Sequence, residues 1–182
     1  MRIAYADPPY IGQAKRHYAK EASYAGEVDH ARLLAQLSLY DGWALSASSP
    51  SLQAILALCP NGVRIAAWVK PFGIFKPGVN PAYVWEPVIF VPARSGKDRL
   101  GGRKAPTVRD WVSCNVTLRR GLAGAKPEGF CFWLFDLLGI EEGDEFVDMF
   151  PGTGGVTAAF QKWQAQRGKE GEKPLTPLPP PA

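Results

Sequence analysis

The chain contains few of the residues that build metal centres or disulfide frameworks, with three cysteines and two histidines among 182 residues. Cys59, Cys114 and Cys131 are odd in number and have no metal-like spacing, so we expect reduced, mostly buried thiols. His17 and His30 have no paired ligands within range in the sequence. The sequence therefore predicts neither a disulfide-rich fold nor a metal site.

Long apolar runs and a strong net charge are also absent. No apolar run approaches the roughly 20 residues that a membrane-spanning helix requires, and residues 1–4 enter a strand pattern at once rather than a signal peptide. The net charge is +4 at pH 7, and 46% of the residues are hydrophobic. We therefore expect one soluble globular domain, located in the cytoplasm and without a membrane partner.

Strand-like and helix-like segments alternate along the chain, which predicts an α/β fold. Strands are expected over 2–6, 42–47, 63–69, 83–91 and from Glu145, and helices after Asp29, after Ser49, over 127–138 and over 156–166. Because the strands 63–69 and 83–91 are expected to pair antiparallel, the sequence predicts a mainly parallel sheet with an antiparallel hairpin at one edge and helices on both faces.

The first strand runs directly into Asp7-Pro8-Pro9-Tyr10. Neither proline can donate to a sheet, so the strand must end there, and the prolines stiffen the backbone that follows. A carboxylate, a carbonyl and an aromatic ring are thus held at the carboxyl end of a strand. They suit a flat ligand with an amino group, although an ordinary strand-ending turn would use the same residue types.

A glycine-rich turn, Asp148-Met149-Phe150-Pro151-Gly152-Thr153-Gly154, follows the last predicted strand and precedes a helix. Glycines let the backbone approach a ligand closely, and the helix N-terminus offers unpaired amides to an anion. The turn lacks the spacings of the common nucleotide-binding glycine motifs. Upstream, Lys126-Pro127 opens an apolar helix that Gly139 is expected to stop.

These three motifs resemble those of the S-adenosylmethionine-dependent DNA N6-adenine methyltransferases. Asp-Pro-Pro-Tyr is similar to their catalytic motif, and the Lys-Pro and glycine motifs are similar to their cofactor motifs. The order, catalytic motif first and glycine motif last, resembles the permuted subclass. The resemblance implies a Rossmann-like sheet and transfer of a methyl group from S-adenosylmethionine to the N6 amine of adenine in DNA.

The resemblance also implies roles for individual residues. Asp7, Pro8, Pro9 and Tyr10 would be catalytic, with Asp7 and the Pro8 carbonyl accepting from the target amine and Tyr10 stacking on the base. The cofactor would be positioned by a second set of residues, namely Lys126, Pro127, Asp148, Phe150, Gly152, Thr153 and Gly154. Trp85-Glu86 resembles a further family segment, but Glu86 is equally a turn acid on an edge strand, and no catalytic role is assigned to it.

Positive charge is concentrated between Arg94 and Lys126, where nine basic residues face two acids, for a segment charge of +7. A phosphate-contacting loop and a solvated surface loop both fit this composition. In the permuted subclass the target-recognition region falls within 94–125. A second basic segment follows Tyr10 and is either a lid over the site or an exposed connection. The predicted nucleic-acid contacts are Lys15, Arg16, Arg103, Lys104, Arg119 and Arg120.

The chain after the glycine motif is short compared with the family pattern. We expect one methyltransferase-like domain over 1–166 and a disordered, charged and proline-rich tail over 167–182. In the family two further strands follow the glycine motif, and the first ends in an acid that binds the cofactor ribose. The resemblance therefore implies weak cofactor binding, or a pocket completed by a second subunit in a homodimer, by the substrate, or by Glu170 or Glu172.

Two other functions remain open from the sequence. One is methylation of RNA or a small-molecule amine by the same fold. The other is a catalytically weak or inactive methyltransferase-like protein that binds nucleic acid. The acid at position 7 favours adenine over cytosine by resemblance only, because many N4-cytosine enzymes carry serine there.

Overall fold

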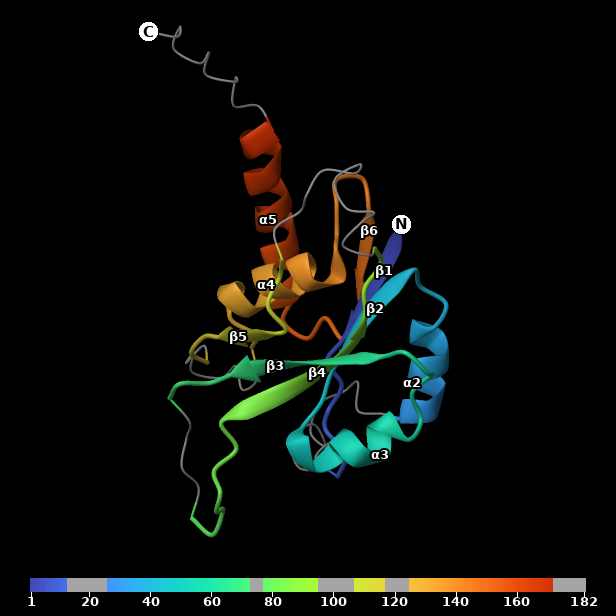
Figure 1. The fold of residues 1–182 in the computed structure, drawn as a ribbon, viewed down its shortest axis with the longest axis vertical. Helices are drawn as coiled ribbons and strands as arrows, with labels where there is room; N and C mark the ends of the chain where they lie inside the picture. The colour runs from blue at the N-terminus through green and yellow to red at the C-terminus, as the bar shows by residue number, and fades with distance from the viewer. Residues whose placement is uncertain (13–25, 73–76, 95–106, 117–124, 172–182) are drawn as a thin grey trace, which may run out of the picture.

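The computed structural model describes residues 1–12, 26–72, 77–94, 107–116 and 125–171. Through this part runs a six-stranded sheet with the strand order β5-β3-β4-β2-β1-β6 (Figure 1). The strands are β1 (Arg2–Ala6), β2 (Gly42–Ser46), β3 (Arg64–Val69), β4 (Trp85–Val91), β5 (Trp111–Ser113) and β6 (Glu145–Asp148).

The sheet is mixed. β1 pairs parallel with both β2 and β6, and β3 pairs parallel with β5. β4 lies between β2 and β3 and is antiparallel to both. The expected antiparallel hairpin is therefore confirmed, but the short strand β5, which the sequence did not indicate, lies outside it and is the edge strand on that side of the sheet.

Helices cover both faces of the sheet (Figure 1). On one face α4 (Glu128–Leu138) and α5 (Gly155–Gly171) pack over a core that contains Phe130, Phe135, Phe160 and Trp163. On the other face α2 (His30–Leu37), the 3-10 turn η1 (Ser49–Ser51) and α3 (Leu52–Leu56) cover a second apolar core. This arrangement confirms the predicted α/β fold with helices on both faces.

The helix ends follow the local sequence. The Asp29 side chain caps α2 by accepting from the backbone amide of Arg32 at 3.0 Å. Gly139 ends α4 with φ +72°, a left-handed conformation that glycine adopts without the penalty of a Cβ. α5 continues beyond its expected end at Gln166 to Gly171, so residues 167–171 of the predicted tail are helical.

A buried ion-pair network joins the start of the chain and the end of the segment after β4 to the turn before β6. Asp144, in the turn before β6, is 3% exposed and accepts from the Arg94 guanidinium at 2.8 Å and from the Met1 ammonium group at 2.7 Å. The hydrogen bond from Arg94 holds the pKa of Asp144 well below its usual range. Two segments that are far apart in sequence are thereby joined beside β6.

Two negative findings concern the described part of the chain. None of its helices combines the length and apolar character needed to cross a bilayer. No group of three or more histidine, cysteine or acidic side chains within the described ranges could hold a metal ion.

Candidate active site

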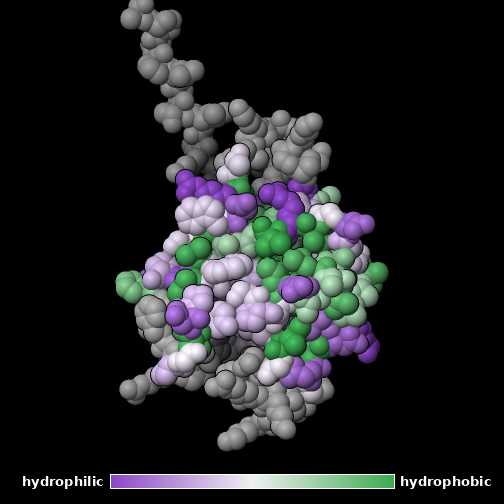
Figure 2. All heavy atoms as spheres, turned by 60° about the horizontal axis from the view of Figure 1, so that its bottom comes forward, coloured by the Kyte–Doolittle hydropathy of each residue, from purple (hydrophilic) through white to green (hydrophobic). Residues whose placement is uncertain are grey.

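The parallel strands β1 and β6 finish along the same side of the sheet, which we call its carboxyl edge. β4 runs the opposite way, so its first residues lie at this edge too. β2 also ends there, and the Tyr5 hydroxyl and the Ser46 hydroxyl form a buried hydrogen bond of 2.8 Å between β1 and β2. Figure 2 turns this edge toward the viewer and shows a surface on which apolar and polar residues are mixed. In open sheets with parallel strands, this edge is where ligands bind.

Lys126 lies at the centre of the charged groups at this edge. Its side chain is 4% exposed, and its ammonium group is 3.0 Å from an Asp7 oxygen and 3.0 Å from a Glu86 oxygen. The ammonium also lies 5.3 Å from the ring centre of Trp68, which favours the cation. A buried lysine thus links the residue after β1 to the second residue of β4.

Glu86 has two further neighbours. The Lys70 ammonium donates to the second carboxylate oxygen of Glu86, and the Tyr10 phenol lies beside the carboxylate and interacts with it. The Glu86 side chain is 14% exposed. Asp7, Tyr10, Lys70, Glu86 and Lys126, which we call the lysine–carboxylate cluster, therefore form one connected set.

The charges of this cluster depend on one another. Burial alone would raise the pKa of Glu86, but Lys126 and Lys70 together lower it. Burial opposes the charge on Lys126, yet Asp7 and the other oxygen groups around it raise the pKa of its ammonium well above the ordinary value. Burial raises the pKa of Asp7, and Lys126 opposes that rise. Lys126 thus favours the ionised form of Asp7.

Asp148 supplies a third carboxylate at the same edge. On the neighbouring strand β1 it pairs in register with Tyr5, and Tyr5 precedes Asp7 by two residues. One of its oxygens accepts from the backbone amide of Phe150 at 3.2 Å, while the other is buried and has no hydrogen-bond partner in the described structure. Burial raises the pKa of Asp148, and the bond from Phe150 opposes this effect. An unpartnered buried carboxylate oxygen is costly, so a donor is expected to bind there.

The glycine turn after β6 leaves backbone accessible. Gly152 and Gly154 have φ values of +48° and +78°, and a side chain at either position would be strained. A Cβ at Gly152 would lie 3.9 Å from the Phe150 carbonyl oxygen. Beyond the adjacent residues, no other atom of the described structure lies within 4 Å of where a Cβ would stand at either glycine. The turn leads into α5 at Gly155.

The structure brings together some predicted site residues and does not describe others. Asp7, Tyr10 and Lys126 share one cluster, with Pro8 and Pro9 between the first two and Pro127 after the third. Phe150, Thr153 and the two glycines follow Asp148 in the turn. All six predicted nucleic-acid contacts lie outside the described residues: Lys15, Arg16, Arg103, Lys104, Arg119 and Arg120.

The Lys126 ammonium is engaged by Asp7 and Glu86, and a contact of Lys126 with the cofactor stays a prediction. Glu86, to which the sequence analysis assigned no role, lies on the interior strand β4 rather than on an edge strand and is central to the cluster. A sequence signal did exist, because a charged residue followed by the apolar stretch Pro87–Val91 is unusual in a buried strand.

No protein-family model and no curated protein sequence matches the chain. Among solved structures, the chain is similar to the M1.HpyAVI–SAM complex, with 14% identity, a TM-score of 0.57 and coverage of 90% of this chain and 78% of that one. A structure of M1.HpyAVI gives 15% identity, a TM-score of 0.55 and coverage of 89% and 76%. At this identity the likeness concerns the fold, and the chain has a Rossmann-like methyltransferase fold.

Proposed function

We propose that this chain transfers a methyl group from S-adenosylmethionine to the N6 amine of adenine in DNA. The observation that carries the proposal is Asp7, a carboxylate at the carboxyl end of β1 that a buried lysine holds at 3.0 Å. The similar fold of a structure described as a complex with SAM supports the choice of cofactor.

The residues beside Asp7 fit this cofactor. Its methionine end carries an ammonium and a carboxylate. The unpartnered oxygen of Asp148 offers an acceptor to the ammonium, and the glycine turn with the first turn of α5 offers backbone amides to the carboxylate. When bound, S-adenosylmethionine supplies an electrophilic methyl carbon.

In the proposed reaction Asp7 and the Pro8 carbonyl accept hydrogen bonds from the two amine hydrogens. This would orient the nitrogen lone pair and stabilise the positive charge that develops on nitrogen as the nitrogen–carbon bond forms and the sulfonium–methyl bond breaks. The leaving group would be a neutral thioether, and the surplus amine proton would pass to the Asp7 carboxylate. Lys126 and Glu86 act as positioning residues, because Lys126 favours the ionised form of Asp7 and Glu86 holds Lys126. Tyr10 is proposed to stack on the adenine ring.

DNA is the proposed macromolecular substrate. In a duplex the adenine must leave the stack before its amine can reach Asp7. The basic residues at Lys15, Arg16, Arg103, Lys104, Arg119 and Arg120 are proposed to contact phosphates, which would make affinity fall with salt.

Product analysis tests the function. The full chain is incubated with methyl-labelled S-adenosylmethionine and unmethylated DNA, and the digested nucleosides are separated by mass spectrometry. We expect labelled N6-methyladenine. Labelled N4-methylcytosine, or label found only with RNA or a small amine, would contradict the proposed substrate. DNA binding with no label in any product would favour a binding protein.

A further inference from the structure

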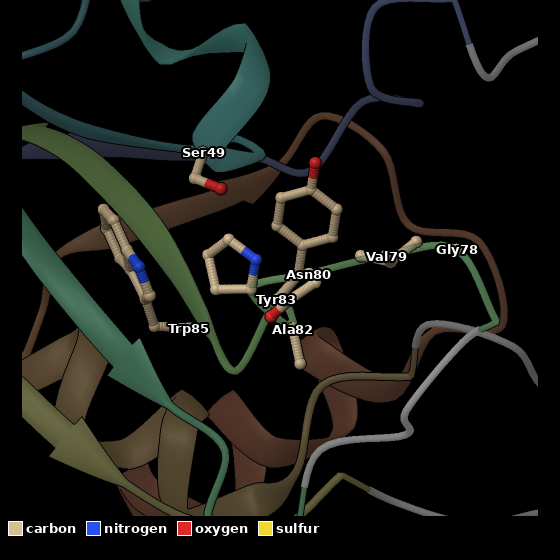
Figure 3. Close-up of a pocket in the computed structure, with 8 residues that line it drawn as sticks. Ser49, Gly78, Val79, Asn80, Ala82, Tyr83 and Trp85 are labelled. Carbon is tan, nitrogen blue, oxygen red and sulfur yellow. The ribbon is translucent and has the colours of Figure 1, made fainter.

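A hollow lies beside the first residue of β4, on the side of the strand opposite Glu86 and the lysine–carboxylate cluster. It has a volume of about 290 Å³ and is lined by Ser49, residues 78–83 and Trp85 (Figure 3). In the view of Figure 3 the side chains of Trp85 and Tyr83 stand apart, with Ser49 above them and the five-membered ring of a further lining residue drawn between them. Asp7, Tyr10, Glu86 and Lys126 do not line it.

The chemistry of the lining favours a flat ring with polar edges. Tyr83 and Trp85 are 58% and 37% exposed, so both rings leave surface for stacking. Asn80 and Ser49 carry an amide and a hydroxyl that can donate and accept. None of the lining residues is acidic, so a ligand next to a phosphate is not repelled. The volume lies at the lower limit of drug-sized pockets, which span about 300–1,000 Å³, and suits one ring system.

The position relates this hollow to the proposed reaction. Trp85 and Glu86 are consecutive residues of β4, so their Cα atoms are about 3.8 Å apart and their side chains point to opposite faces of the sheet. β4 begins at the end of the sheet where β1 and β2 finish, and Ser49 follows β2, so the hollow and the lysine–carboxylate cluster lie at the same end of the sheet. The hollow is therefore next to the site proposed for the target adenine.

We propose that this hollow binds the base of the nucleotide next to the methylated adenine, with Trp85 and Tyr83 as stacking surfaces and Asn80 as the group that reads the base edge. The inference rests on the proposed function and adds a site at which the enzyme selects sequence. The amide of asparagine matches the paired donor and acceptor of adenine, so adenine is the base expected to bind best there.

A double-mutant cycle in DNA binding tests this site. Dissociation constants are measured by fluorescence anisotropy for the full chain and short single-stranded oligonucleotides in which a central adenine has an adenine on each side and there is no other adenine. The oligonucleotides carry an abasic site at the 5′ neighbour, at the 3′ neighbour, at the central adenine itself, or nowhere. Trp85→Ala is compared with wild type, with Trp85→Phe as the conservative variant, and with Trp111→Ala as the control.

We expect Trp85→Ala to weaken binding of the intact oligonucleotide by about five- to a hundredfold, the typical loss of one base–aromatic stack. An abasic site at one neighbour should cause a similar loss in wild type and no further loss in Trp85→Ala. Trp85→Phe should keep most of the coupling. Trp111 is 45% exposed and lies on β5, outside the hollow. Any change in the dissociation constant caused by Trp111→Ala should therefore be the same with and without the abasic site.

The inference is overturned if the affinity losses from Trp85→Ala and from the abasic site are independent of each other at both neighbouring positions. Coupling between Trp85 and the target adenine itself would overturn it too. Absence of measurable binding to any oligonucleotide would overturn it as well. Methylation of the same oligonucleotides is measured alongside. Coupling of Trp85 to a neighbouring base without methylation would contradict the proposed function but support the base-binding site. Methylation without such coupling would support the proposed function but contradict the base-binding site.

Discussion

At the scale of single residues, the main feature is that Lys126 is shared between Asp7 and Glu86 at 3.0 Å each. The Lys126 side chain is only 4% exposed, and a lysine buried to this extent keeps its charge when carboxylates pair with it. The same contact keeps Asp7 ready to accept hydrogen bonds. In the proposed function the two carboxylates have different tasks: Asp7 accepts from the substrate amine, and Glu86 holds the Lys126 ammonium.

The pH dependence of methylation should reveal this division. The proposed function requires ionised Asp7, so we expect activity to be lost as pH falls through the pKa of Asp7. Lys126→Met removes the group that lowers the pKa of Asp7 and should move the acid limb of the kcat profile to higher pH. Loss of the charge-assisted contact should also lower kcat at neutral pH by about ten- to a hundredfold.

Glu86→Gln should move the same limb in the opposite direction, because Glu86 raises the pKa of Asp7. The control is Lys162→Met, which removes a lysine from a surface pair with Glu128 in which both side chains are at least half exposed. Its profile should match wild type. An acid limb that stays in place in both cluster variants would show that Asp7 does not control the rate.

At the scale of elements, the strands and helices were largely predictable, whereas their long-range contacts were not. The two prolines after Ala6, the Asp29 cap and the Gly139 stop are local signals, and each marks a boundary that the structure confirms. The Lys126–Glu86 contact joins residues 40 apart in sequence, and no periodicity contains that information. β5 was missed because three residues are too few to form a pattern.

The packing of β2 against the segment after β4 gives a test of the fold. A Cβ at Gly42 would lie 2.5 to 2.7 Å from the backbone and methyl group of Ala93, so the chain must shift to accept it. Gly42→Ala should lower the free energy of unfolding by about 1–3 kcal/mol in urea titrations.

The matched control is Gly129→Ala in α4. The nearest atom there is the Cys114 Cβ at 3.8 Å, and alanine favours a helix by about 1 kcal/mol over glycine. This variant should be as stable as wild type or more so. Equal stability of the Gly42 variant and wild type would mean that β2 and Ala93 do not pack as described.

The Asp144–Arg94 pair gives a second test at this scale. The pKa of Asp144 is depressed in the folded chain, so its contribution to stability is present above the unfolded value of about 3.9 and is lost as pH falls through the folded value. Asp144→Asn should lower the free energy of unfolding at pH 7 by about 1.5–3 kcal/mol. The difference from wild type should shrink in acid, and a difference that is constant with pH would contradict the role of the ion pair.

At the scale of the whole molecule, β6 is an edge strand, and among the described residues no strand follows it. The proposed contacts of the cofactor are thus confined to its methionine end, at Asp148 and the glycine turn. Glu170 lies within α5, and Glu172 lies outside the described residues. We propose that an acceptor for the cofactor ribose is supplied by the substrate, by a second subunit, or by Glu170 or Glu172.

Calorimetry with S-adenosylmethionine checks this expectation. Loss of one charge-assisted hydrogen bond costs about 1.5–3 kcal/mol, which is roughly ten- to a hundredfold in affinity. We expect weak binding by dilute protein that strengthens when protein concentration is raised or DNA is added. Tight binding by a monomer, independent of protein concentration and of DNA, would show that the pocket is already complete.

Asp7 is proposed to be the acceptor for an adenine amine, and a single-turnover methylation assay measures that role. Enzyme in excess over labelled DNA is mixed with S-adenosylmethionine, and N6-methyladenine is followed in wild type and Asp7→Ala. Unfolding midpoints and calorimetric binding of the cofactor show that the variant is folded and loaded. We expect the rate of methyl transfer to fall by about 10²–10³, the cost of one preorganised partner of a developing charge. Methylation by Asp7→Ala at the wild-type rate would contradict the proposed role of Asp7.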